Sequence, residues 1–150
     1  MAIQAKIQVD APPERVFDVL ADITGHGTWA NQKAGLQVTP VPLWHGSAPI
    51  LGFRFGSFAY LTDCSGIPDA SWPLVAGVET LVIDALRDKK HTTHFTVAEA
   101  VEAIARVGPR RAYLTHMSHD LGHVQTNARL PQGVELAYDG LSLDVHVDAS

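Results

Sequence analysis

The chain has 150 residues, of which 46% are hydrophobic, so it is long enough for one compact domain with a sizeable core. Its formal net charge is -5 and no basic run is interleaved with aromatic residues, which does not favour nucleic acid as a partner. Cys64 is the single cysteine, which excludes an intrachain disulfide and favours a reduced, cytoplasmic setting. The N-terminal segment carries charges and no long apolar run, so we expect neither a signal peptide nor a membrane anchor.

The segment 1–31 is predicted to form a strand followed by a helix. Apolar residues alternate over Ile3–Val9, and Pro13 suits the first turn of a helix whose apolar stripe runs from Val16 to Ile23. This opening, with APPERVFDVLADITGHGTWA, resembles the start of the START-like polyketide cyclase/dehydrase superfamily. The resemblance implies a small-molecule binding module with an apolar cavity.

The character of the chain changes near Asn31–Gly35, and an alternation of strands and helices follows. Thr96 and Glu99 form a capping box at the start of the longest of these helices. The strand–helix–strand passage around it predicts a parallel pair with a right-handed crossover. The fold class is therefore α/β, with a mixed sheet and flanking helices in a single domain, 1–150. We expect strands over 36–43, 50–55, 58–62, 80–86 and 111–115, helices over 68–75 and 97–107, a helical turn at 125–129, and a terminal hairpin of 134–138 with 141–147.

Side chains suited to metal chemistry stand at the boundaries of these elements, where functional sites are usually built. Histidine and aspartate are the ligands expected of zinc or manganese, and an aspartate can bridge two ions. The candidates are His45, Asp63, His94, His116 and His119.

Several motifs between about residues 35 and 143 point to one family: VPLWHG, TLVIDALR, HTTHFTVAEAVEAI, GPRRAYLTHMSHDLGH and AYDGL. Together they resemble the C-terminal half of a metallo-β-lactamase-fold hydrolase. The most similar subgroup comprises the cyclic-phosphate phosphodiesterases of phosphonate breakdown and the related tRNA 3′-processing nucleases. The implied architecture is half of a two-sheet sandwich.

The resemblance implies a role for each candidate. His45 and His116 match terminal ligands of the first and the second metal, and Asp63 matches the carboxylate that bridges them. His94 matches a histidine that donates a proton or contacts phosphate, and His119 matches an extra histidine near the second metal. His94 and His119 are therefore the candidate catalytic residues, and His45, Asp63 and His116 the candidate metal ligands.

The family's His-x-His-x-Asp-His motif does not occur in the sequence. We therefore interpret the chain as a recombinant or designed chimera, residues 1–31 START-like and 32–150 metallo-β-lactamase-like, with no intact active site and weak or absent zinc or manganese. The alternatives are a residual metal-dependent phosphodiesterase and the small-molecule binding module. An uncovered apolar face on half a sandwich predicts a homodimer with exchanged elements.

Overall fold

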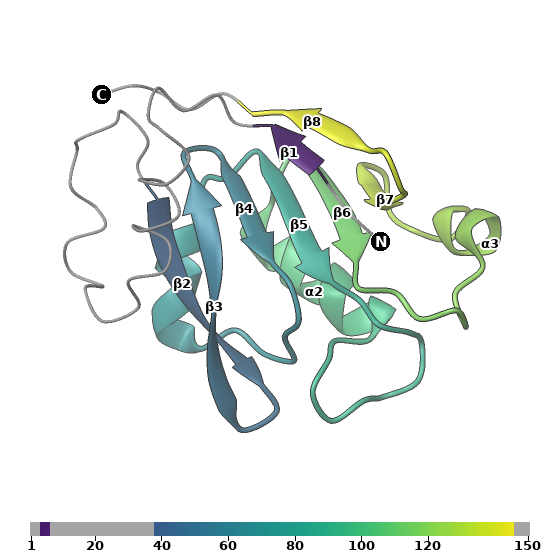
Figure 1. The fold of residues 1–150 in the computed structure, drawn as a ribbon, viewed down its shortest axis with the longest axis horizontal. Helices are drawn as coiled ribbons and strands as arrows, with labels where there is room; N and C mark the ends of the chain where they lie inside the picture. Colours follow the sequence, from purple (N-terminus) through teal and green to yellow (C-terminus); the bar gives the residue numbers. More distant parts are fainter. Residues whose placement is uncertain (1–3, 7–37, 146–150) are drawn as a thin grey trace.

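The computed structural model describes residues 4–6 and 38–145 of the chain. These residues form a mixed sheet with flanking helices, as the sequence predicts (Figure 1). The strands are β1 (Gln4–Lys6), β2 (Val38–His45), β3 (Ala48–Phe55), β4 (Phe58–Leu61), β5 (Thr80–Asp84), β6 (Arg111–Thr115), β7 (Val134–Leu136) and β8 (Ser142–Asp144), and the helices are the 3-10 helix η1 (Asp69–Val75), α2 (Val97–Val107) and α3 (His123–Asn127).

The main sheet has the strand order β2-β3-β4-β5-β6-β7. β3 is antiparallel to both β2 and β4, whereas β4, β5, β6 and β7 are parallel to one another. As a result β2, β4, β5 and β6 all end at one edge of the sheet, the lower edge in Figure 1. We call it the carboxyl edge, because the residues that follow these strands meet there.

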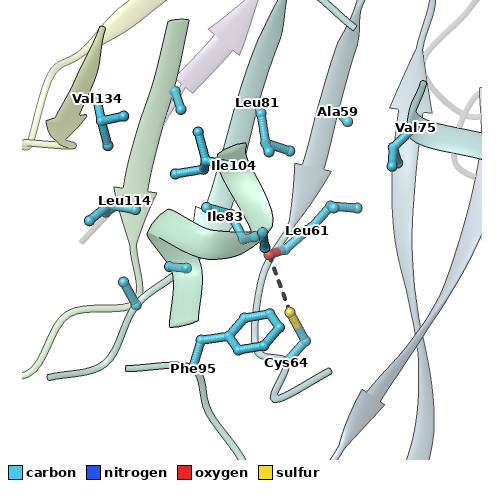
Figure 2. Close-up of a cluster of buried hydrophobic side chains, with 14 of the residues drawn as sticks. Ala59, Leu61, Cys64, Val75, Leu81, Ile83, Phe95, Ile104, Leu114 and Val134 are labelled. Carbon is cyan, nitrogen blue, oxygen red and sulfur yellow. Dashed lines mark hydrogen bonds between the residues drawn. The ribbon is translucent and has the colours of Figure 1, made fainter. Parts of the chain in front are cut away.

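Helix α2 covers one face of the sheet. The predicted capping box is confirmed: the Thr96 side chain accepts from the Glu99 amide, and the Glu99 carboxylate accepts from the Thr96 amide. Gly108 ends the helix in the left-handed conformation. The apolar side of the helix, including Ile104, packs over Leu81 and its neighbours on the central strands (Figure 2).

The opposite face of the sheet is covered by the chain itself in the part that the structure describes. Phe58, Val82 and Tyr113 of the central strands pack against Leu141 and Leu143, which follow β7. The apolar face that led us to expect a homodimer is therefore shielded here without a partner. The homodimer stays a prediction.

The predicted terminal hairpin is wrong. The turn at Asp139-Gly140 exists, with Gly140 at φ +90°. However, β7 pairs with β6, β8 pairs with β1, and both pairs are parallel. Val134 and Leu136 are buried in the core that β6 also lines, so burial selects β6 rather than the strand next in sequence.

Within the segment 1–31, the structure describes Gln4–Lys6, which form β1. The predicted helix from Pro13 to Ile23 lies outside the described residues. Within the described part of the chain, no helix is long and apolar enough to cross a membrane.

The reciprocal capping bonds generate a stability prediction. Thr96→Ala removes the side-chain acceptor for the Glu99 amide and should lower the free energy of unfolding by about 1 kcal/mol. Glu99→Ala removes the return bond, so the double variant should lose less than the sum of the two single losses. Urea denaturation of the three variants measures this, and strict additivity would contradict a coupled box.

Candidate metal centre

Two candidate ligands occupy a strained backbone conformation at the carboxyl edge. Asp63, two residues after β4, has φ +56°, and His116, directly after β6, has φ +62°. They are the two non-glycine residues with positive φ in the described part of the chain. Such a conformation costs about 1 kcal/mol or more for a side chain with a Cβ, and it is typical of functional sites.

One carboxylate oxygen of Asp63 faces three imidazoles. Its Oδ1 lies 3.4 Å from His45 Nε2, 3.5 Å from His94 Nδ1 and 3.6 Å from His116 Nε2. These residues come from the ends of β2, β4 and β6 and from the loop between β5 and α2. The structure therefore brings together four of the five residues that the sequence singled out.

His94 lies in the middle of the histidines. Its ring centroid is 5.0 Å from that of His45 and 4.7 Å from that of His116. His91 stacks on it at 4.9 Å with an interplanar angle of 26°. Burial, and then the neighbouring His116, lower the pKa of His94 below its ordinary value, which disfavours the charged form of its ring.

Asp84 is a site residue that the sequence analysis missed. It ends β5, is fully buried, and accepts a hydrogen bond at Oδ2 from the Phe95 amide. Its Oδ1 lies 3.4 Å from His94 Nδ1, yet neither atom has a hydrogen-bond partner. Burial raises the pKa of this carboxyl to about 7. The sequence pattern that could have indicated it is the acidic residue at the end of the otherwise apolar strand TLVID.

The donor atoms fit a divalent cation. They form two sets of three, His45 with Asp63 and His94, and Asp84 with His94 and His116, and within each set the atoms lie within 4.8 Å of one another. Three protein donors of this type are what a catalytic zinc site usually provides. The two buried atoms without partners, Asp84 Oδ1 and His94 Nδ1, give an independent reason to expect a cation or a proton between them.

Hydrogen bonds join the loops that carry these residues. The Trp44 amide donates to the Gly66 carbonyl, and the Gly46 amide donates to Ser65 Oγ. The Phe95 amide donates to both the Cys64 carbonyl and Asp84 Oδ2, at 2.9 Å each. The loops after β2, β4 and β5 are therefore held as one unit.

Two other residues lie outside the cluster. His119 has a side chain that is 97% exposed and meets only the Asp120 carboxylate, at 3.6 Å, among the ion pairs of the described residues. Its catalytic role stays a prediction that the geometry does not favour. Cys64 is buried, and burial raises the pKa of its thiol well above the usual range, which agrees with a small apolar core residue rather than a nucleophile.

A family model for the beta-lactamase superfamily domain matches residues 4–117. The chain belongs to this superfamily. Among solved structures, a diphosphatase of the PhnP family has a TM-score of 0.77 at 45% identity, over 80% of this chain and 47% of that chain.

Two further structures show the same fold. The metallo-beta-lactamase fold protein YhfI from Bacillus subtilis matches with a TM-score of 0.60 at 16% identity, over 81% of this chain and 59% of that chain. The short form of human tRNase Z matches with a TM-score of 0.57 at 24% identity, over 74% of this chain and 44% of that chain.

A protein named octanoyltransferase from Porphyromonas gingivalis (strain ATCC BAA-308 / W83) is 35% identical over 112 residues. The match includes 73% of this chain and 23% of that protein. The chain thus spans about half the length of the diphosphatase and about a quarter of the length of the octanoyltransferase.

These matches correct the interpretation of the chain as a chimera. A single family model spans residues 4–117 and crosses the junction that we expected near Asn31–Gly35. The START-like resemblance of the segment 1–31 finds no support, and the binding-module alternative loses the resemblance on which it was based. The hydrolase alternative is the interpretation that the comparisons favour.

The turn after β2 generates a prediction about site geometry. Gly46 has φ +61°, and a Cβ there would lie 3.1 Å from Thr93 Cγ2, next to His94. Gly46→Ala should lower the free energy of unfolding by about 1–2 kcal/mol and shift the His94 ring resonances, because the loop must move. Gly77→Ala is the matched control, since Gly77 has φ +74° and open space around it. Comparable His94 shifts in both variants would contradict the coupling.

Asp84 generates a prediction about pH dependence in metal-free protein. Its folded pKa of about 7 lies above the ordinary value of 3.8, so this carboxyl stabilises the fold fully below pH 3.8 and loses that contribution as the pH rises to 7. The loss is of order 4 kcal/mol. In Asp84→Asn this decrease should be absent. Urea denaturation of both proteins with EDTA at several pH values between 4 and 8 measures it, and parallel curves would count against a raised pKa.

Proposed function

We propose that this chain binds a divalent cation, zinc or manganese, and hydrolyses phosphate esters or diphosphates. The observation that carries the proposal is the Asp63 oxygen facing His45, His94 and His116 at 3.4–3.6 Å. Membership of the beta-lactamase superfamily and 45% identity to a PhnP-family diphosphatase support it. Because the chain spans 47% of that diphosphatase, its activity and substrate are proposals for this chain.

In this proposal Asp63 holds the cation together with His45 and His116, which belong to the two different donor sets. Asp63 is central, because its carboxylate lies between the two imidazoles and is 55% exposed, so it remains open to a substrate. A bound cation supplies Lewis acidity that polarises a phosphoryl oxygen and offsets the negative charge that develops on it. The fixed loops keep the donors in place without a substrate.

In this proposal His94 transfers a proton, and Asp84 positions the His94 ring. Asp84 Oδ1 and His94 Nδ1 are 3.4 Å apart and can share one proton. The carboxylate is anchored by the Phe95 amide, so the orientation of the His94 ring is fixed from the buried side. His94 then protonates the leaving oxygen from Nε2 while its Nδ1 takes up the proton of the Asp84 carboxyl, a contribution that typically reaches about 100-fold or more in rate.

Metal analysis and turnover test the proposal together. Purified protein is titrated with Zn²⁺ and with Mn²⁺ by calorimetry, and hydrolysis of bis(p-nitrophenyl) phosphate and inorganic diphosphate is followed. Asp63→Asn should abolish both metal binding and turnover. Asp69→Asn is the matched control, because Asp69 is 97% exposed on η1 and away from the cluster. Metal binding and turnover that survive Asp63→Asn would end the proposal.

His94→Gln separates a proton donor from a ligand. If His94 donates a proton, the variant should bind the cation as the parent does and lose about 100-fold in kcat. If His94 is instead a ligand, as its membership of both three-residue sets allows, the Kd for the cation should rise. An unchanged kcat with unchanged binding would contradict both roles.

A further inference from the structure

Exposed apolar side chains flank the proposed metal centre. The large ones in the described part of the chain are Trp44, Val124 and Tyr138, with 42%, 76% and 50% of their surface exposed. Trp44 precedes His45 at the β2 end of the sheet. Tyr138 is two residues beyond β7 at the other end, on the side of His116.

The sheet register places the end of β7, which Tyr138 follows, beside the end of β6, which His116 follows. Leu136 pairs with Leu114 in the parallel β6–β7 ladder, and the Ala137 amide donates to the Leu114 carbonyl at 2.9 Å. Tyr138 is therefore the second residue beyond the end of β7, and His116 directly follows the neighbouring strand β6.

Hydrogen bonds from β7 to α3 fix the His123 ring. Asn127 Oδ1 accepts from the Leu136 amide at 2.8 Å, so the Asn127 amide nitrogen is the atom that faces His123 Nδ1, at 3.2 Å. That nitrogen can only donate, so Nδ1 accepts and the proton of the neutral ring is on Nε2. The His123 ring meets the Tyr138 ring edge-on, with centroids 6.5 Å apart.

We propose that Tyr138 and His123 form a subsite for the planar heterocyclic base of a nucleotide-type substrate. The proposal rests on the proposed function and names its substrate class. The half-exposed Tyr138 ring offers a stacking surface, and the His123 Nε2–H offers a donor to a ring nitrogen or carbonyl of the base. Stacking of a base on an aromatic side chain tolerates different bases, and its loss by alanine substitution reduces affinity about 5- to 100-fold.

Adenosine and ribose are the probes, because neither carries phosphate and neither needs a metal. Metal-free protein is titrated with each and followed by NMR at pH 8.5, where the free imidazole is neutral. Adenosine should shift the Tyr138 and His123 ring resonances saturably, and ribose should not. Tyr138→Ala should weaken adenosine binding about 5- to 100-fold, whereas Tyr138→Phe, which keeps the ring, and Trp44→Ala should retain it.

The His123 tautomer gives a second readout. In the parent protein, ¹⁵N shifts should show His123 protonated at Nε2. Asn127→Asp keeps an acceptor for the Leu136 amide but offers His123 Nδ1 an acceptor in place of a donor, so the proton should move to Nδ1. Adenosine binding should then weaken although both rings remain.

The outcomes separate this subsite from the proposed function. Adenosine shifts that avoid both rings, loss of binding in Trp44→Ala instead of Tyr138→Ala, or binding unaffected by Asn127→Asp would each overturn the subsite. Saturable adenosine binding without any turnover of phosphate substrates would support the subsite and contradict only the hydrolase. Turnover of phosphate substrates without adenosine binding would support the hydrolase and overturn the subsite.

Discussion

The Phe95 amide is the contact on which the site geometry depends most. It donates to a side chain at the end of β5, Asp84, and to a backbone carbonyl after β4, that of Cys64. It also directly follows His94, so the same bonds set the position of that ring. Because Asp84 is fully buried, water cannot replace this donor, and its loss would leave a charged or polar group unsatisfied in the core.

Parallel pairing then converts distant sequence into a local cluster. Asp63, Asp84 and His116 are far apart along the chain, yet β4, β5 and β6 are neighbours and end at the same edge. Because β3 is antiparallel to both β2 and β4, β2 runs in the same direction as β4. Its last residue, His45, therefore lies at the same edge as the other three. Strand direction thus brings the site residues to one edge, and the hydrogen-bonded loops set the positions of their side chains.

Much of this arrangement was predictable from local sequence patterns. The capping box at Thr96 and the strand that begins at Thr80 each have a local physical cause, and both predictions are confirmed. Asp84 was missed because its apolar neighbours indicate a strand buried in the core. Only the fold shows that the carboxylate at the end of this strand faces His94. The pairing of β7 with β6 and of β8 with β1 depends on contacts between residues that are distant in sequence, and a local turn pattern does not predict such contacts.

The segment 1–31 shows the limit of short patterns. A strand followed by an amphipathic helix is common to many α/β proteins, so it is a weak guide to family, and the superfamily match overturns the assignment made from it. His119 shows a similar limit: it follows His116 closely in the sequence, but its side chain points to solvent rather than to Asp63. Proximity in sequence does not give proximity in the site.

The left-handed backbone at Asp63 and His116 has a consequence for how the sequence would change over time. Glycine adopts this conformation without steric penalty, so replacing either residue by glycine would relieve the strain. If the pair served no purpose, mutation would be free to drift toward that more stable state. A chain with an aspartate and a histidine there forgoes stability at two positions, as expected where backbone strain is retained for a functional site.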